Sequence, residues 1–151
     1  MNRDSSIGAA AVLVVEEEPI ILDMISEELT RKGFLVLEAE TGEAALSMIE
    51  SDQRVDVLFT DTRLPGKLNG WQLAQAAREN HPEIPVVYVS GFVIEGQAAA
   101  VPGSTILKKP YRLSAVVETI RILIHNRRSA QRLWSYEGLI EAPALQHRQD
   151  R

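Results

Sequence analysis

The sequence predicts an α/β domain whose core is a parallel β-sheet covered by helices. Five short apolar runs rich in β-branched residues occur along the chain, and they are continuous rather than alternating. Such runs are typical of strands that are buried on both faces. Amphipathic stretches lie between most of the runs. This alternation favours a parallel sheet with right-handed crossover connections.

The first strand is predicted over residues 10–15, six apolar residues that precede three consecutive glutamates. A helix is predicted over 19–32, where Pro19 suits the first turn and Gly33 is a natural stop. Its apolar stripe consists of Ile21, Leu22, Ile25 and Leu29. The second strand is predicted over 34–37.

The same alternation continues through the next two units. A helix over 41–51 begins at Thr41, a favoured capping residue, and is followed by a strand over 55–60. A helix over 71–80 ends before a proline and is followed by a strand over 85–90.

The last unit differs from the others in its connection. The segment 93–103 is expected to hold at most a short helix, because it contains Gly96, Pro102 and Gly103. A strand over 105–107 and a strongly apolar helix over 113–126 complete the predicted core.

Length and composition indicate one domain with a tail. The chain has 151 residues, no cysteine and a net charge of −5. We expect a disordered N-terminus over 1–9, a core over 10–127, and a partly helical tail over 128–151 with helical character over 130–141. Eighteen of the 21 acidic residues lie before residue 125, so the tail is mildly basic.

Composition also excludes several classes of function. The absence of cysteine rules out disulfides, thiolate metal sites and cysteine nucleophiles. An acidic pI of about 5.2 argues against general nucleic-acid binding. No apolar run approaches the roughly 20 residues that a membrane span needs. With no recognisable export signal, the cytoplasm is the expected compartment.

Polar side chains follow four of the predicted strands where each strand ends. Glu16 and Glu17 follow the first strand, Asp61 the third, Ser90 the fourth, and Lys109 the fifth. Because sites in open α/β sheets form beyond the carboxyl ends of the strands, we expect these side chains to converge. Any one of them alone is more typical of a helix cap or a solvated loop residue.

The chemistry of this set points to phosphoryl transfer. Three carboxylates repel one another, and Mg²⁺ together with Lys109 would compensate their charge. A rigidly held Asp61 can act as a nucleophile and form an acyl phosphate. Ser90 and Lys109 would then contact the phosphoryl oxygens.

At these residues the sequence resembles a known family. Residues 10–127 resemble the receiver domain of two-component response regulators. The matching segments are VLVVEEEP at 12–19, LFTDTRLPG at 58–66, VYVSG at 87–91 and LKKPY at 107–111. The resemblance implies a flavodoxin-like, doubly wound sheet of five parallel strands in the order 2-1-3-4-5, with helices on both faces.

The resemblance also implies roles for individual residues. Asp61 would be the phosphoacceptor, served by a histidine kinase or a histidine phosphotransfer protein. Glu16, Glu17 and Asp61 would bind Mg²⁺ together with the backbone carbonyl of Arg63. Ser90 would be the switch hydroxyl and Lys109 the family's lysine, and Ile106 stands where the family often has an aromatic switch residue.

The chain departs from the family pattern at four points. Glu17 replaces the usual aspartate. Ile106 has no aromatic ring that could move between an inward and an outward position. The loop 65–70 is one residue longer than the common form. The spacing from Ser90 to Lys109 is short, which shortens the fourth helix and makes a standard dimer through that face a weaker expectation.

The leading hypothesis is a single-domain response regulator that signals by contact with a downstream protein. It would dephosphorylate slowly by itself and would not be an enzyme with a soluble substrate. A receiver-like binding module that works without phosphorylation is the alternative. A small phosphohydrolase is disfavoured because Arg63 stands where a second catalytic aspartate would be needed. Homodimer formation and the role of the tail, which contains Trp134, stay open.

Overall fold

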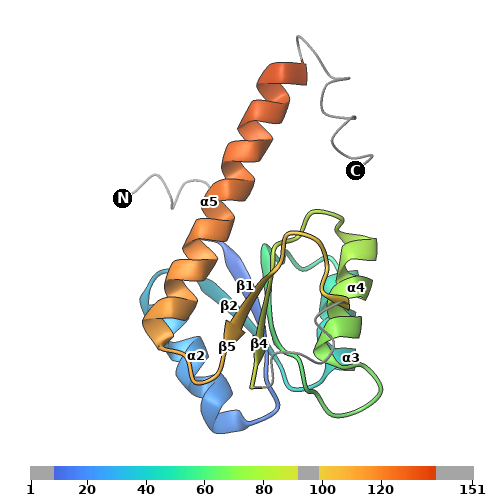
Figure 1. Cartoon of the computed structure of the whole chain (residues 1–151), viewed down its shortest axis with the longest axis vertical. Helices are drawn as coiled ribbons and strands as arrows, with labels where there is room; N and C mark the ends of the chain where they lie inside the picture. Colours follow the sequence, from blue (N-terminus) through green and yellow to red (C-terminus); the bar gives the residue numbers. More distant parts are fainter. Residues whose placement is uncertain (1–8, 92–98, 139–151) are drawn as a thin grey trace.

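The computed structural model describes residues 9–91 and 99–138, with side chains through residue 130 (Figure 1). Five parallel strands form one sheet in the order β2-β1-β3-β4-β5, which confirms the predicted fold class and strand order. The strands are β1 (Ala11–Val15), β2 (Leu35–Ala39), β3 (Val57–Asp61), β4 (Val86–Ser90) and β5 (Thr105–Lys108).

Helices cover both faces of the sheet, and each face has its own apolar core. The helices are α2 (Pro19–Arg31), α3 (Gly42–Glu50), α4 (Gly70–Asn80) and α5 (Leu113–Gly138). One core lies between the sheet and the pair α2 and α5. The other lies between the sheet and the pair α3 and α4. The alternate side chains of β1 and β3 point into opposite cores, which is why these strands read as continuous apolar runs.

The strand β2 extends further than predicted, because an edge strand can include an exposed polar residue that interrupts the apolar run. The apolar run suggested 34–37, whereas the strand includes Glu38 and ends at Ala39. An edge strand has one neighbour, here β1, and part of its surface meets solvent, so Glu38 is exposed. The burial of β2 is therefore incomplete, in contrast to the full burial of β1, β3 and β4.

Polar caps define where two of the helices begin. The Thr41 side chain accepts a hydrogen bond from Ala44 N at the start of α3. At the start of α4, Asn69 and Gln72 form a reciprocal capping box. This cap fixes the entry of the chain into α4 directly after the loop that follows Asp61.

The helix α5 is one continuous element of 26 residues. The helix predicted to end at residue 126 and the helical part of the tail are therefore a single helix as far as Gly138. Figure 1 shows its C-terminal part extending beyond the sheet. Near the sheet, Arg127 Nη1 donates a hydrogen bond to Asp56 O at 3.2 Å, which ties α5 to the start of β3.

Several sequence expectations fall on residues outside those described. The disordered N-terminus predicted over 1–9 lies outside the described residues except for residue 9, and so does the part of the predicted short helix 93–103 that precedes residue 99. The irregular end predicted after Pro143 lies wholly outside them. In the ranges 9–91 and 99–138, no helix is both long enough and apolar enough to cross a bilayer.

We predict that Ile25→Ala lowers the free energy of unfolding by about 2–5 kcal/mol, because it leaves a cavity under α2. Ile25 is 1% exposed and belongs to the core beneath α2 and α5. Urea unfolding checks this value. Met24→Ala on the same helix is the control, since Met24 is 49% exposed, and its effect should stay within about 0.5 kcal/mol. Equal losses in the two variants would contradict the packing described.

Candidate functional site

The register of the sheet brings the ends of four strands to one level. Thr60 pairs with Val15, and Asp61 pairs with Val89, so the last residue of β3 stands beside the residue that follows β1 and beside the second-last residue of β4. Ser90 pairs with Lys108 at the end of β5. The convergence expected from the sequence is therefore a direct result of parallel pairing.

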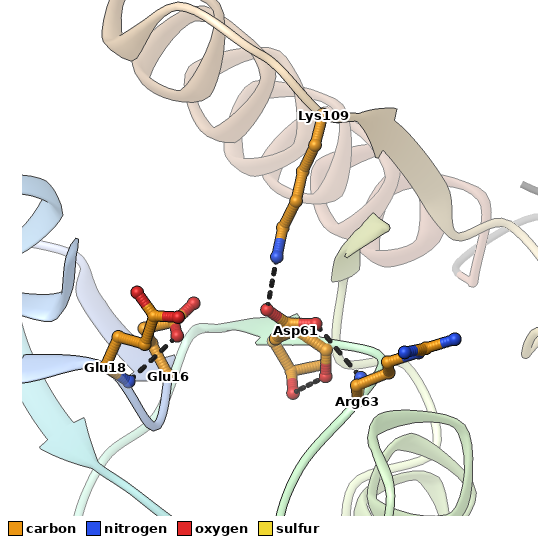
Figure 2. A network of polar contacts seen from close by, with 6 residues as sticks. Glu16, Glu18, Asp61, Arg63 and Lys109 are labelled. Carbon is orange, nitrogen blue, oxygen red and sulfur yellow. Dashed lines mark hydrogen bonds and ion pairs between the residues drawn. The ribbon is translucent and has the colours of Figure 1, made fainter. Parts of the chain in front are cut away.

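Asp61 is held by contacts from three directions. Its side chain is nearly buried, and its Oδ2 lies 2.7 Å from Lys109 Nζ (Figure 2). Its Oδ1 accepts a hydrogen bond of 3.0 Å from the backbone N–H of Arg63. Its backbone carbonyl accepts a hydrogen bond from Thr60 Oγ1. The carboxylate is thus fixed in orientation at the end of a rigid strand.

Glu16 is the second buried carboxylate of the site. It is 4% exposed and accepts a hydrogen bond of 3.0 Å from Glu18 N, as Figure 2 shows. Burial is the main cause that raises the pKa of Glu16, and the Glu18 N–H opposes this rise. The charge of Asp61 also raises the pKa, and that of Lys109 lowers it. Glu16 and Asp61 therefore share one electrostatic environment.

Ser90 and Lys109 are joined through the backbone. Lys109 N donates to Ser90 O at 2.9 Å, and Ser90 is buried. The Lys109 side chain is 36% exposed and reaches across to Asp61. Ser90, at the end of the neighbouring strand β4, and Lys109 thus flank the acceptor as the sequence predicted.

The structure brings some of the predicted metal ligands together and separates others. Glu16 and Asp61 lie close enough to affect each other's charge, and the Arg63 backbone contacts Asp61. The side chain of Glu17 is exposed. Among the described residues, no three or more His, Asp or Glu side chains are grouped so that they could hold a metal ion. The metal role of Glu17 stays a prediction.

The donor set fits a hard divalent cation. Two buried carboxylates, Glu16 and Asp61, face a single ammonium group from Lys109, which leaves a net negative charge in a poorly solvated place. Mg²⁺ commonly binds proteins through one or two carboxylates while it keeps several waters. Glu16, Asp61 and the backbone of Arg63 are therefore the residues that would hold it.

Two contacts that sequence reasoning missed shape the loop after Asp61. The Glu43 carboxylate, at the start of α3, accepts a hydrogen bond of 2.8 Å from Lys67 N, and this bond lowers the pKa of Glu43. A Cβ placed on Gly70 would lie 2.1 Å from Asp61 O, so α4 begins in direct contact with the acceptor backbone. The glycine was visible in the sequence, whereas nothing there indicated the contact of Glu43.

Tyr111 is a further residue near the acidic pair. It packs against the core under α2 and α5. Burial, together with the charges of Glu16 and Asp61, raises its pKa from 10 to about 12. The phenol is therefore held in its neutral form up to a higher pH than an exposed tyrosine would be.

The fold and the site agree with a family match. The model of the response regulator receiver domain matches residues 12–121. This chain belongs to that family, which serves two-component signalling systems. Receiver domains take phosphoryl groups from histidine kinases.

Individual relatives show the extent of the similarity. The chain is 29% identical over 124 residues to the sensor kinase CckA of Brucella abortus, covering 80% of this chain and 13% of the kinase. It is 30% identical over 129 residues to the nitrogen assimilation regulatory protein NtrX of Azorhizobium caulinodans, covering 81% of this chain and 28% of that protein. This chain thus spans less than a third of either relative.

Solved structures show the same relationship at the level of the whole domain. A response regulator receiver protein from Sinorhizobium medicae superposes with a TM-score of 0.77 at 34% sequence identity. The match covers 80% of this chain and 98% of that one. The receiver domain of a hybrid histidine kinase CckA superposes with a TM-score of 0.67 at 29% identity, over 76% of this chain and 99% of that domain.

We predict that Tyr111 titrates at about pH 12 in the folded protein. The difference between the ultraviolet titrations of wild type and Tyr111→Phe isolates this phenol. Because the folded state holds the proton more tightly than the unfolded state, the stability that Tyr111 contributes is present below pH 10 and is lost as the pH rises to about 12. A Tyr111 titration at its ordinary pKa of 10 would contradict the described burial of the phenol and its proximity to the carboxylates.

Proposed function

We propose that Asp61 accepts a phosphoryl group from a histidine kinase or a histidine phosphotransfer protein, and that the modified chain signals by contact with a downstream protein. The observation that carries this proposal is the fixed, nearly buried carboxylate of Asp61 beside Glu16 and 2.7 Å from Lys109 Nζ. A structural ion pair alone would not require a second buried carboxylate next to it, because that carboxylate raises the electrostatic cost.

The proposed step is a displacement at phosphorus. An oxygen of the Asp61 carboxylate attacks the phosphorus of a phosphohistidine, and a new P–O bond forms. The P–N bond breaks, its electron pair stays on the imidazole nitrogen, and that nitrogen takes a proton. The product is an aspartyl phosphate on this chain and a histidine on the donor.

The chain's own residues orient the carboxylate and neutralise charge in this step. The Arg63 N–H holds Asp61 Oδ1, so the carboxylate plane is fixed before the donor arrives. Lys109 already contacts Oδ2 and would pair with an oxygen of the bound phosphoryl group. Ser90, at the end of the neighbouring strand, would donate a hydrogen bond to another of these oxygens.

Magnesium is the expected cofactor. Glu16, Asp61 and the Arg63 carbonyl would hold it, and Glu17 would join them if its exposed side chain turns inward. When bound, the cation supplies positive charge against the phosphoryl oxygens. We further propose that water slowly hydrolyses the acyl phosphate, so the chain resets itself and is a signalling protein rather than an enzyme with a soluble substrate.

Three observations favour a second candidate, a receiver-like module that binds its partner without phosphorylation. Glu17 is exposed, and no grouping of three metal-binding side chains occurs among the described residues. Ile106 also replaces the aromatic residue that often accompanies switching. In this candidate, Lys109 and Asp61 would form a permanent structural pair.

We predict that acetyl phosphate with Mg²⁺ adds one phosphoryl group to the wild type and none to Asp61→Asn. Asparagine keeps the shape of the side chain but lacks the charged nucleophilic oxygen. Intact-mass analysis at fixed times measures the modification. Asp23→Asn is the matched control, because Asp23 is exposed on α2 and should be modified as the wild type is. Equal modification of the wild type and Asp61→Asn would rule out Asp61 as the acceptor.

The dependence on magnesium separates the two candidates. We predict that Glu16→Gln raises the Mg²⁺ concentration needed for half-maximal modification by about tenfold or more, because Glu16 faces Asp61 in a buried place. Glu17→Gln removes an exposed charge and should have a smaller effect. A larger effect of Glu17→Gln would show that Glu17 is the main ligand. Wild-type protein that is never modified at any Mg²⁺ concentration would favour the module without phosphorylation.

A further inference from the structure

The ring of Tyr88 lies at the centre of the face covered by α3 and α4. Tyr88 belongs to β4, two residues before Ser90, and its side chain is fully buried. Its ring packs against that of Trp71 with centroids 4.4 Å apart and a tilt of 42°. This aromatic pair joins the middle of the sheet to the beginning of α4.

Through Trp71 the pair reaches the acceptor's own backbone. Trp71 directly follows Gly70, whose position lies against Asp61 O so closely that no Cβ fits there. Gly70 N also donates a hydrogen bond to Thr62 O at 2.9 Å. A shift of the backbone at Asp61 would therefore displace the first turn of α4 and, with it, the Trp71 ring.

Through its hydroxyl, Tyr88 reaches the segment that leads into β5. Val101 N donates a hydrogen bond of 3.1 Å to Tyr88 Oη in a buried place. The carbonyl of Val101 accepts hydrogen bonds from Ser104 N and Ser104 Oγ. Both backbone polar groups of Val101 are thus hydrogen-bonded, and residues 99–104 continue directly into the strand that ends beside Lys109.

The residue at position 106 cannot supply this connection. Ile106 is the register partner of Tyr88 on β5 and packs in the same core, but its side chain has no polar atom. The aromatic hydroxyl that bonds to Val101 N is therefore on β4 and not at the β5 position that the family resemblance indicated.

We propose that Tyr88 is a positioning residue that links the state of Asp61 to the segment 99–104, with the Trp71 ring on one side and the Val101 amide on the other. This link rests on the proposed function: phosphorylation of Asp61 alters the packing of α4 on Tyr88. The altered packing changes the hydrogen bond from Val101 N to Tyr88 Oη. By reciprocity, loosening Val101 must also alter the environment of Asp61. Residues 99–104 are then a part of the surface that reports phosphorylation.

A double-mutant cycle tests this link without any phosphorylation. Tyr88→Phe removes the hydroxyl and keeps the ring on Trp71, and Asp61→Asn changes the charge of the acceptor. The readout is the hydrogen-exchange rate of the Val101 amide in wild type, both single variants and the double variant. We expect Asp61→Asn to change this rate, and the change to differ by about threefold or more when Tyr88→Phe is present. Additive effects, or no effect of Asp61→Asn, would overturn the proposal.

Ser104→Ala is the matched control for local loosening. It removes the hydrogen bond from Ser104 Oγ to Val101 O and the interaction of Ser104 with the Tyr88 hydroxyl, but it keeps the hydrogen bond from Val101 N to Tyr88 Oη. In the Ser104→Ala background, Asp61→Asn should still change the hydrogen-exchange rate of the Val101 amide. Loss of this change would show that any weakening of residues 99–104 abolishes the link, and it would contradict a specific role of Tyr88. Intact-mass analysis after acetyl phosphate treatment reports the proposed function separately, so failure of phosphorylation and failure of the Tyr88 link give different results.

Discussion

A buried carboxylate needs compensating charge and hydrogen bonds, and at Asp61 these come from segments that are far apart in the sequence. Lys109 supplies the charge from the end of β5, and the N–H of Arg63 supplies a hydrogen bond from the following loop. Glu16 adds a second negative charge from the end of β1. The site therefore exists only when the strands pair in register, and its excess negative charge suits it to a cation. In the proposed function, that cation and Lys109 would neutralise the charge of the phosphoryl group.

The sequence was sufficient to predict the sheet and the residues that gather at the ends of its strands. Continuous apolar runs predict strands buried on both faces, and parallel pairing then aligns whatever follows them, which placed Asp61, Ser90 and Lys109 correctly at one edge. The contacts of Glu43 with Lys67 N and of Tyr88 with Val101 N could not be predicted. They join loops to distant elements, and such contacts leave no periodic pattern in the chain.

The departures from the family pattern have different structural consequences. Glu17 is exposed, so the longer side chain is not forced into the buried acidic pair. The longer loop after Asp61 is closed by the Glu43 carboxylate, and its Gly66 adopts a φ of 90° that glycine accommodates without strain. Ile106 lacks the aromatic group that the family often has at this position. Its register partner on the adjacent strand, Tyr88, carries a polar aromatic group.

The continuity of α5 gives the domain a mechanical property. A helix of 26 residues is about 39 Å long, and hydrogen bonds along its backbone resist bending. Its first half packs on the sheet, and Arg127 bonds to Asp56 O at the start of the strand that ends in Asp61. A small change in the tilt of α5 at the sheet therefore produces a larger displacement at the far end of the helix. This displacement grows with the length of helix beyond its last contact with the sheet.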